Sequence, residues 1–341
     1  MLVAVGCAQG SSTPTPSRTP SASLVGWAVG DRGTMLTTTD GGRRWRRASS
    51  GVSTDLVDID FASAQDGCAV GDWRTILTTR DAGGTWLRQD AATDSYLTCV
   101  DFADPVHGWI GGERGLIATS DGGRTWARQE TAWRSNAEQD AWCYGLHFVD
   151  GQHGWAVGGA NDADYGVIAA TSDGGATWQS QHLSGETSPY LDHALLLAVT
   201  ATDSRHVWAV GWDILLSTDG GANWSDQPQH PKFFELNDVE FVDSLHGWTV
   251  GETGSGGSTG RGIVLVTTDG GLTWSRQGTP PTGGLSSIQF TSPTHGWITG
   301  GDRSFKGVIL ETKNRGETWT RQRLPRGTPY LRAITFPPDS P

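Results

Sequence analysis

Two short phrases alternate along the chain, and each occurs seven times when a few substitutions are allowed. The first is Gly-Trp-x-x-Gly, as in HGWAVGG at residues 153–159, and the second is TSDGGRTW at residues 119–126. Consecutive copies of the second phrase are 40 to 52 residues apart. A chain that repeats one unit at such a period folds as a series of similar modules, so the repeat constrains the fold more than any other feature. The first phrase is centred on Trp27, Cys68, Trp109, Trp155, Trp208, Trp248 and Trp297, and the second ends on Trp45, Trp86, Trp126, Trp178, Trp224, Trp274 and Trp319.

Each repeat unit predicts four short strands. Apolar and polar residues alternate before the first phrase, as in VDIDF at 57–61, and on both sides of the second, as in GLIATS at 115–120 and WARQE at 126–130. Such alternation marks strands, and the first phrase supplies one more. Four strands that recur every 40 to 50 residues are typical of a β-propeller blade. The strands are named A to D in chain order, with the first phrase as B.

The two ends of the repeat region predict that the ring closes. The region begins with a strand B at 25–30 and ends with a strand A at 331–336. Together they complete a seventh blade, which leaves no open sheet edge. We therefore predict an all-β, seven-bladed propeller with four antiparallel strands per blade over residues 24–336, followed by a tail at 337–341.

The repeated acid of the second phrase is interpreted as structural. In the C–D turn its carboxylate can accept backbone N–H groups, and the following glycines permit a positive φ. The tryptophan is expected to cap the apolar layer of the sheet and can donate its indole N–H. An acid repeated in every blade argues against catalysis at any one copy. The position is held by Asp40, Asp81, Asp121, Asp173, Asp219 and Asp269, and by Asn314 in the last unit.

A histidine precedes five copies of the first phrase, in the predicted A–B turn. Because each histidine belongs to a different blade, the five are expected to be too far apart to share a metal ion. We interpret them as partners in local turn hydrogen bonds, and the sequence predicts no metal site, no cofactor and no catalytic residue. The five are His107, His153, His206, His246 and His295.

The irregular segments all fall on one predicted face, which is made by the B–C turns and the D–A links and which we call the loop face. Its longest segments are 131–142, 160–166, 184–194, 230–235, 252–262 and 302–307. Variable loops on a rigid scaffold are where binding usually resides. The tryptophans outside the repeat map to this face, and so do four arginines of the B–C turns. These residues are Trp73, Trp133, Trp142 and Trp212, with Arg32, Arg74, Arg114 and Arg303.

Aromatic and arginine side chains are the usual anchors of protein interfaces, so these eight residues are predicted to bind a protein partner. Flat aromatic rings also suit sugars, and the same side chains can instead pack their own loops. The net charge of −12 argues against nucleic-acid binding, which needs a basic surface. No apolar run is long enough to span a membrane, and a monomer is expected.

The first 23 residues differ from the repeat region. An apolar run ends at Gly6-Cys7, and residues 8–23 are rich in Ser, Thr and Pro. The run resembles the end of a bacterial lipoprotein signal without its charged leader, which suggests a start assigned too late. We expect Cys7 to be lipidated, residues 8–23 to be a tether and the propeller to be extracytoplasmic. The alternative is a ragged terminus without function.

Three further cysteines are Cys68, Cys99 and Cys143. Cys99 and Cys143 both lie near the start of predicted inner strands in adjacent units, so they could pair. Buried free thiols are the alternative.

The second phrase matches the Asp-box or BNR repeat. In particular, GDRGTMLTTTDGGRRW at 30–45 and GERGLIATSDGGRTW at 112–126 resemble the repeat of the photosystem II stability/assembly factor family. The resemblance implies a propeller that acts as a non-catalytic assembly chaperone for membrane protein complexes. In that family an arginine-rich surface is implicated in partner binding. In this chain Arg32, Arg74, Arg114 and Arg303 are the positions that could form one.

The rival interpretation is a glycan-binding protein or a sialidase-like glycoside hydrolase, since such proteins also carry Asp-boxes. A hydrolase of this class needs a pair of carboxylates, or an arginine cluster with a tyrosine nucleophile. Asp72, Asp213 and Asp302 could supply the pair on the loop face. The Arg-Ile-Pro motif usual in sialidases is absent from the sequence.

Overall fold

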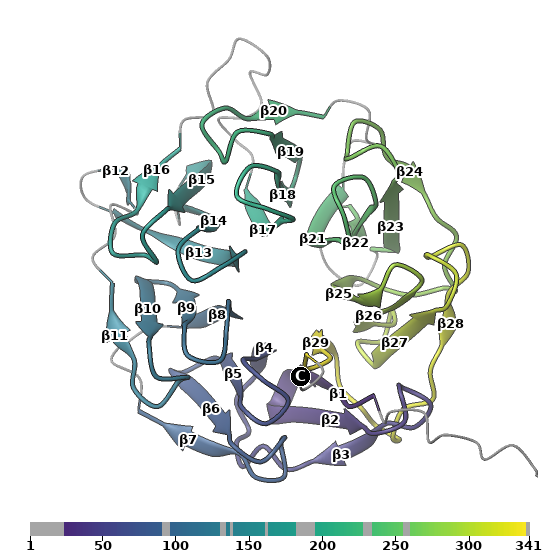
Figure 1. Cartoon of the computed structure of the whole chain (residues 1–341). Coiled ribbons are helices and arrows are strands. Elements are labelled where there is room, and N and C mark those ends of the chain that lie inside the picture. The colour runs from purple at the N-terminus through teal and green to yellow at the C-terminus, as the bar shows by residue number, and fades with distance from the viewer. Residues whose placement is uncertain are drawn as a thin grey trace, which may run out of the picture.

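The computed structural model describes residues 24–90, 96–129, 134–136, 139–160, 163–181, 195–227, 234–254 and 260–338. Seven β-sheets stand around a central axis as the blades of a propeller (Figure 1). Within each blade neighbouring strands are antiparallel, and strands A to D run from the axis to the rim. No helix in the described part of the chain is long and apolar enough to cross a membrane.

The blades are numbered 1 to 7, beginning with the one that holds both ends of the repeat region. In that order the innermost strands, A, are β29 (Leu331–Thr335), β4 (Leu56–Phe61), β8 (Leu97–Phe102), β13 (Gln139–Phe148), β17 (Leu196–Ala201), β21 (Phe234–Phe241) and β25 (Leu285–Ser292). The B strands are β1 (Gly26–Gly30), β5 (Gly67–Gly71), β9 (Gly108–Gly112), β14 (Gly154–Ala160), β18 (Val207–Gly211), β22 (Gly247–Thr253) and β26 (His295–Gly301).

The C strands are β2 (Thr34–Thr38), β6 (Thr75–Thr79), β10 (Gly115–Thr119), β15 (Ala163–Thr171), β19 (Ile214–Ser217), β23 (Gly262–Thr267) and β27 (Gly307–Thr312). The D strands, at the rim, are β3 (Arg46–Ala48), β7 (Leu87–Gln89), β11 (Ala127–Arg128), β16 (Gln179–Ser180), β20 (Ser225–Asp226), β24 (Ser275–Arg276) and β28 (Thr320–Arg321). A short 3-10 turn, η1 (Asp31–Gly33), joins β1 to β2.

The ring closes as predicted, through a blade built from both ends of the repeat region. Strand β29 pairs antiparallel with β1, with Ala28 opposite Ile334 and Trp27 opposite Thr335. The inner strands of successive blades contact one another all the way round, including β25 with β29 and β29 with β4. Neither end of the repeat therefore presents an unpaired sheet edge at the junction.

Blade 4 departs from the prediction of four strands. A fifth strand, β12 (Arg134–Asn136), pairs with the start of β13, in a segment expected to be a loop. Strand β13 begins earlier than the other inner strands because β14 is also longer, and Trp142 pairs with Gly159 at this extension. The longer partner satisfies backbone groups that a loop would leave to solvent.

The two repeated phrases interlock between blades. The indole N–H of Trp155 donates to the carbonyl of Gly220, in the second phrase of the next blade, over 3.0 Å. A Cβ added at Gly271 would lie 2.8 Å from the indole nitrogen of Trp208, and its φ is +89°, so both packing and backbone require glycine there. The same cross-blade bond joins Trp109 to Gly174, Trp208 to Gly270 and Trp248 to Arg315.

The tryptophan of the second phrase behaves differently from the expectation that it donates its indole N–H. Its ring packs edge-on against the last aromatic of strand A, as Trp178 does against Phe148. Trp109 of the preceding blade stacks on the other side of Phe148. The indole N–H of the second-phrase tryptophan is buried and has no acceptor among the described residues in any of the seven copies. Four tryptophans of the first phrase donate instead, whereas the indole N–H groups of Trp27 and Trp297 also have no acceptor among the described residues.

A second set of cross-blade bonds joins the inner strands of neighbouring blades. Side-chain oxygens of one inner strand accept backbone N–H groups of the next, and the last such bond crosses from blade 7 to blade 1. The acceptor and donor pairs are Asp58 with Val100, Asp60 with Phe102, Asp101 with Phe148, Asp238 with Ile288 and Gln289 with Phe336, at 2.6 to 2.8 Å.

Candidate functional site

The B–C turns and the ends of the D–A links are joined by backbone hydrogen bonds. In each of four blades, the first residue of the B–C turn donates its N–H to the carbonyl just before strand A. The pairs are Asp31 with Tyr330, Asp72 with Asp55, Glu113 with Tyr96 and Trp212 with Leu195, at 3.0 to 3.2 Å. These hydrogen bonds therefore fix the described B–C turns and the ends of the D–A links to the rigid sheets.

Three B–C turns carry residues in the left-handed backbone region without being glycine. Arg32 has φ 58°, Trp73 φ 56°, Arg74 φ 59° and Phe305 φ 54°. Such a conformation costs an L-residue about 1–2 kcal/mol, and strain of this kind clusters at functional sites. Two of the four are the large apolar side chains Trp73 and Phe305, which are 66% and 57% exposed.

An aromatic row crosses blades 2, 3 and 4 on the loop face. It consists of Trp73, Tyr96, Trp142 and Tyr144, with ring centroids 5.6, 6.2 and 5.8 Å apart in that order. Trp73 comes from the β5–β6 turn, Tyr96 immediately precedes β8, and the other two lie in β13. The row brings together two predicted site residues, Trp73 and Trp142, that are far apart in the sequence.

The other predicted anchors are placed as follows. Trp212 lies in the β18–β19 turn and is 43% exposed. Arg32, Arg74, Arg114 and Arg303 are all exposed. Trp133 lies outside the described residues.

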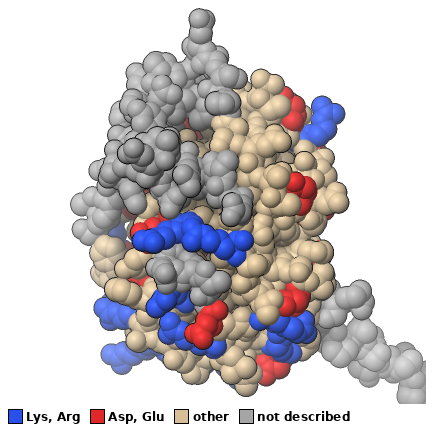
Figure 2. Space-filling view, turned by 90° about the vertical axis from the view of Figure 1, so that its left-hand side faces the viewer, with Lys and Arg blue, Asp and Glu red and all other residues tan. Residues whose placement is uncertain are grey.

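A repeated arginine that was not singled out from the sequence supports the B–C turns. Arg88 in β7 donates to the carbonyl of Trp73 at 3.3 Å, and Arg128 in β11 donates to that of Arg114 at 3.1 Å. The recurring Trp-x-Arg-Gln at the start of strand D is the signal that could have revealed this role. Figure 2 shows the side of the ring that lies on the left in Figure 1, where basic side chains predominate in the lower part with acidic ones between them.

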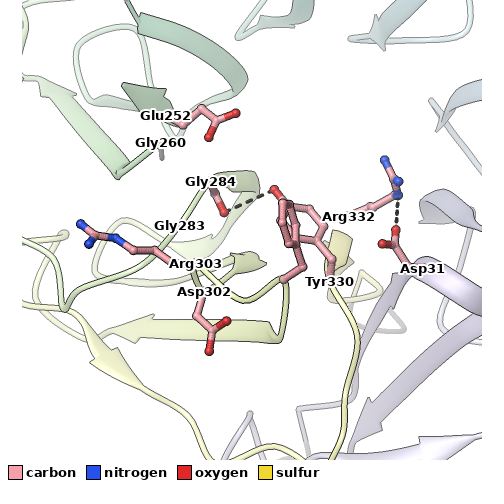
Figure 3. Close-up of a pocket in the computed structure, with 10 residues that line it drawn as sticks. Asp31, Glu252, Gly260, Gly283, Gly284, Asp302, Arg303, Tyr330 and Arg332 are labelled. Atoms are coloured by element: carbon pink, nitrogen blue, oxygen red, sulfur yellow. Dashed lines mark hydrogen bonds and ion pairs between the residues drawn. The ribbon is translucent and has the colours of Figure 1, made fainter. Parts of the chain in front are cut away.

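A pocket of about 280 Å³ lies between blades 6, 7 and 1 on the loop face. Tyr330 stands at its centre (Figure 3), receives a hydrogen bond from Ser286 at 2.7 Å and donates to the carbonyl of Gly284 at 3.3 Å. Burial raises the pKa of Tyr330, so the phenol remains a neutral donor. Glu252, Arg303 and Phe305 also line the pocket.

An ion-pair cluster beside the pocket joins the two ends of the repeat region. Arg332 of β29 contacts Asp31 at 2.7 Å and Asp55 at 3.2 Å. Burial opposes the charge of Arg332, but the two carboxylates hold its pKa above its usual value. Asp55 also accepts the backbone N–H of Arg32 at 2.8 Å, which ties down the strained turn. The sequence signal for Arg332 is a cation in an inner strand where the other blades carry none.

Two acids of the B–C turns pair with arginines of other segments. Asp31 pairs with Arg332, and Asp302 lies 3.7 Å from Arg321. Among the described residues, no ion pair involves the guanidinium groups of Arg32, Arg114 or Arg303.

The three carboxylates named for a hydrolase occupy turns of blades 2, 5 and 7. Burial and the charge of Asp55 raise the pKa of Asp72. Asp302 accepts the backbone N–H groups of Ser304 at 2.8 Å and Lys306 at 3.1 Å. These hydrogen bonds stabilise the B–C turn itself. Asp213 is buried.

The residues of the repeat lie in local turn contacts. Asp121 accepts the N–H groups of Arg124 and Thr125 at 2.9 Å, and these bonds with the Thr125 hydroxyl lower its pKa. Asn314 accepts the N–H of Thr318 in the same manner at 3.0 Å. Corresponding bonds form at Asp40, Asp81, Asp173, Asp219 and Asp269.

Four of the five histidines bond to the aspartate three residues earlier, as His107 does to Asp104 at 2.7 Å. The others of this kind are His153, His206 and His246. His295 differs, because its Nε2 contacts the buried carboxylate of Glu311 at 2.8 Å.

Carboxyl groups of the inner strands have perturbed acidity. Burial raises the pKa of Asp101 and of Asp238 to about 7, and that of Glu240 to about 8. Burial lowers the pKa of His147 to about 4, so this imidazole is neutral near pH 7. Because these carboxyls accept backbone N–H groups between blades, we assign them to the scaffold.

Comparisons with known proteins agree with the geometry of the blades. Residues 45–129 and 232–335, more than half of the chain, match the sequence profile described as photosynthesis system II assembly factor YCF48. The solved structure of YCF48 bound to D1 peptide is similar with a TM-score of 0.62 and 19% identity, over 86% of this chain and 92% of that one. YCF48 from Cyanidioschyzon merolae gives a TM-score of 0.54 and 19% identity, over 78% of this chain and 84% of that one.

Enzymes share the fold as well. An ancestral GH74 enzyme is similar with a TM-score of 0.60 and 14% identity, over 85% of this chain and 38% of that one. No curated protein matches the chain in sequence. At such identity the enzymes show a common architecture only, whereas the sequence profile covers blades 2, 3, 6 and 7 and two strands of blade 1. The chain therefore belongs to the BNR-repeat propeller family of the photosynthesis system II assembly factor YCF48.

Proposed function

We propose that the protein is a non-catalytic scaffold that binds a protein partner through its loop face. The observation that carries the proposal is the aromatic row, which begins at the exposed and strained Trp73 and continues across two blade boundaries. The backbone of Trp73 is held by Arg88 and by the turn itself. A rigid, exposed aromatic side chain loses little entropy on binding and is the usual centre of an interface hot spot.

The family supports a protein as the partner. A relative with the same architecture has been solved with a bound D1 peptide. We propose that this chain likewise binds a polypeptide and that its partner is part of a membrane protein complex. The arginines Arg32, Arg74, Arg114 and Arg303 stand beside the aromatic row and the pocket and are proposed as the polar rim of the interface.

The experiment is an affinity capture from a membrane extract of the native organism with the full-length chain as bait, followed by titration with the purified captured protein. Trp73→Ala and Trp142→Ala are expected to weaken binding at least tenfold each, because each removes a ring of the row. Leu87→Ala is the matched control, since Leu87 is also 66% exposed but lies on the rim strand of the same blade. Equal binding by all three variants would place the interface elsewhere.

Glycan binding is the second candidate, because stacked rings such as Trp142 and Tyr144 also accommodate sugar rings. A glycan array probed with the wild type and with Trp73→Ala separates the two functions. Glycan binding that the substitution abolishes, together with no captured protein, would favour this candidate.

We further propose that the protein is exported and carries a lipid on Cys7. The described chain enters the propeller on the face opposite the loop face, where Leu24 accepts the N–H of Gly41 in a C–D turn. An anchor at that side leaves the loop face accessible. Mass spectrometry of the protein expressed with its upstream coding region tests the modification, and an unmodified Cys7 would remove the proposal.

A further inference from the structure

Two cysteine side chains meet at the boundary between blades 3 and 4. The Sγ atoms of Cys99 in β8 and Cys143 in β13 are 3.7 Å apart. Both residues are buried, at 5% and 0% exposure. This distance is a van der Waals contact between two sulfur atoms, so they need to approach by less than about 2 Å to reach the S–S bond length of about 2 Å.

The space for this contact is created by a glycine. Gly111 of β9 lies opposite Cys99 in the sheet. A Cβ at Gly111 would lie 2.6 Å from the sulfur of Cys143 and 2.7 Å from that of Cys99. Any side chain at this position would clash with both sulfur atoms and force them apart.

Other blades use the position of Cys99 for a cross-blade link. Asp58 and Asp238 stand at the same register in β4 and β21, and each accepts a backbone N–H from the next inner strand at 2.8 Å. Blade 3 has a thiol there in place of a carboxylate. A bond from Cys99 to Cys143 would supply a covalent link at a junction that lacks this hydrogen bond.

We propose that Cys99 and Cys143 form a disulfide that joins blades 3 and 4 when the protein meets a disulfide donor such as oxidised glutathione or a thiol–disulfide oxidoreductase. The two thiols lose two protons and two electrons and form one S–S bond, while the donor disulfide is reduced to two thiols. Cys68 remains a thiol because it lies in another cluster, among Val70, Ile76 and Val100. The disulfide is independent of the partner role proposed above.

Burial determines when the bond forms. Burial and the neighbouring Cys143 raise the pKa of the Cys99 thiol, which disfavours the reactive thiolate in the folded protein. The disulfide is therefore expected to form during folding, before the blades close over the sulfur atoms, and then to resist reductants until the protein unfolds.

The test is oxidative refolding of the full chain with oxidised glutathione, in a Cys7→Ser background that removes the fourth thiol. We expect the product to be lighter by two hydrogen atoms, to titrate one thiol in denaturant instead of three, and to give a peptide that links Cys99 to Cys143. Its melting temperature should exceed that of the reduced protein by about 5–10 °C, because a loop of this length is closed in the unfolded chain.

Single variants locate the bond. Cys68→Ser is expected to form the disulfide as before, whereas Cys99→Ser and Cys143→Ser are expected to retain two titratable thiols each. Gly111→Ala is expected to reduce the oxidised fraction. Three free thiols after refolding, glutathione adducts in place of the internal bond, or a linked peptide containing Cys68 would each overturn the proposal.

Discussion

Trp208 donates its indole N–H to the carbonyl oxygen of Gly270 over 2.9 Å, and the two residues belong to neighbouring blades. The tryptophan comes from one repeated phrase and the glycine from the other. Their contact explains why both phrases recur together, since blades 3 to 6 supply the donors and blades 4 to 7 the acceptors of such bonds. Sheets that share no strands are thus joined by directed bonds as well as by apolar packing.

The cross-blade bond predicts unequal effects of the same substitution. Trp208→Phe should lower the free energy of unfolding by about 1 kcal/mol more than Trp27→Phe. Both tryptophans are buried, but the indole N–H of Trp27 has no acceptor among the described residues. Urea unfolding of the two variants measures the difference, and equal losses would show that the bond adds nothing to packing.

Two positions of the second phrase lack the glycine that their backbone favours. Ala82 has φ 55° and Arg315 φ 61°, where most copies carry glycine. Ala82→Gly and Arg315→Gly should each stabilise the fold by about 0.5 kcal/mol, because relief of left-handed strain exceeds the added entropy of the unfolded chain. Gly122→Ala is the opposite control and should destabilise, since its Cβ would lie 2.6 Å from the carbonyl of Pro105. The melting temperatures of the three variants test this account. A shift in the same direction for all three would contradict it.

The inner-strand carboxyls predict higher stability in mild acid. The folded pKa of Asp101 is about 7 and that of Glu240 about 8, against usual values of 3.8 and 4.5. A carboxyl group whose pKa is raised by folding stabilises the protein fully at pH values below its pKa in the unfolded chain. This stabilisation is lost as the pH rises through its pKa in the folded protein. The melting temperature should therefore be higher at pH 6 than at pH 8.

His147 has the opposite effect on the pH dependence of stability, and it sets the lower end of the pH range in which the protein is most stable. Its folded pKa of about 4 lies below the usual 6.5, so its contribution is complete above pH 6.5 and is lost as the pH falls through 4. Asp101→Asn keeps an acceptor for the N–H of Phe148 and should reduce the difference between pH 6 and pH 8. A wild type that melts higher at pH 8, or a variant with an unchanged difference, would refute the assignment.

The ion-pair cluster at the ring closure predicts a charge-specific loss. Arg332→Met preserves much of the side-chain volume but leaves Asp31 and Asp55 without their shared cation. Because the cluster is partly exposed, we expect a loss of about 1–2 kcal/mol at pH 7 and low salt, and a smaller loss at high salt. Arg326→Met, at an exposed position, should have no measurable effect. The measurement is urea unfolding at two salt concentrations, and a loss that salt does not change would indicate packing instead of charge.

Several features follow from local pattern and were predicted for that reason. The period of the tryptophan phrases, the alternation in strands A and the strand order at the two ends predict seven blades and their closure. These features depend on residues that are close in the sequence. Strand geometry places alternate side chains on opposite faces, so a strand can be predicted from its local pattern of apolar and polar residues. The positions of Trp73, Trp212 and the B–C arginines follow from the same pattern by subtraction.

Partners across blades could not be predicted in this way. Asp31 pairs with Arg332, 301 residues away, and Trp73 meets Tyr96 and Trp142 only because blades 2, 3 and 4 stand side by side. The sequence by itself determined which residues form strands and turns, because strand periodicity and turn chemistry are local. Only the tertiary structure decided which side chains touch between blades, because those contacts depend on the spacing and rotation of whole sheets around the ring.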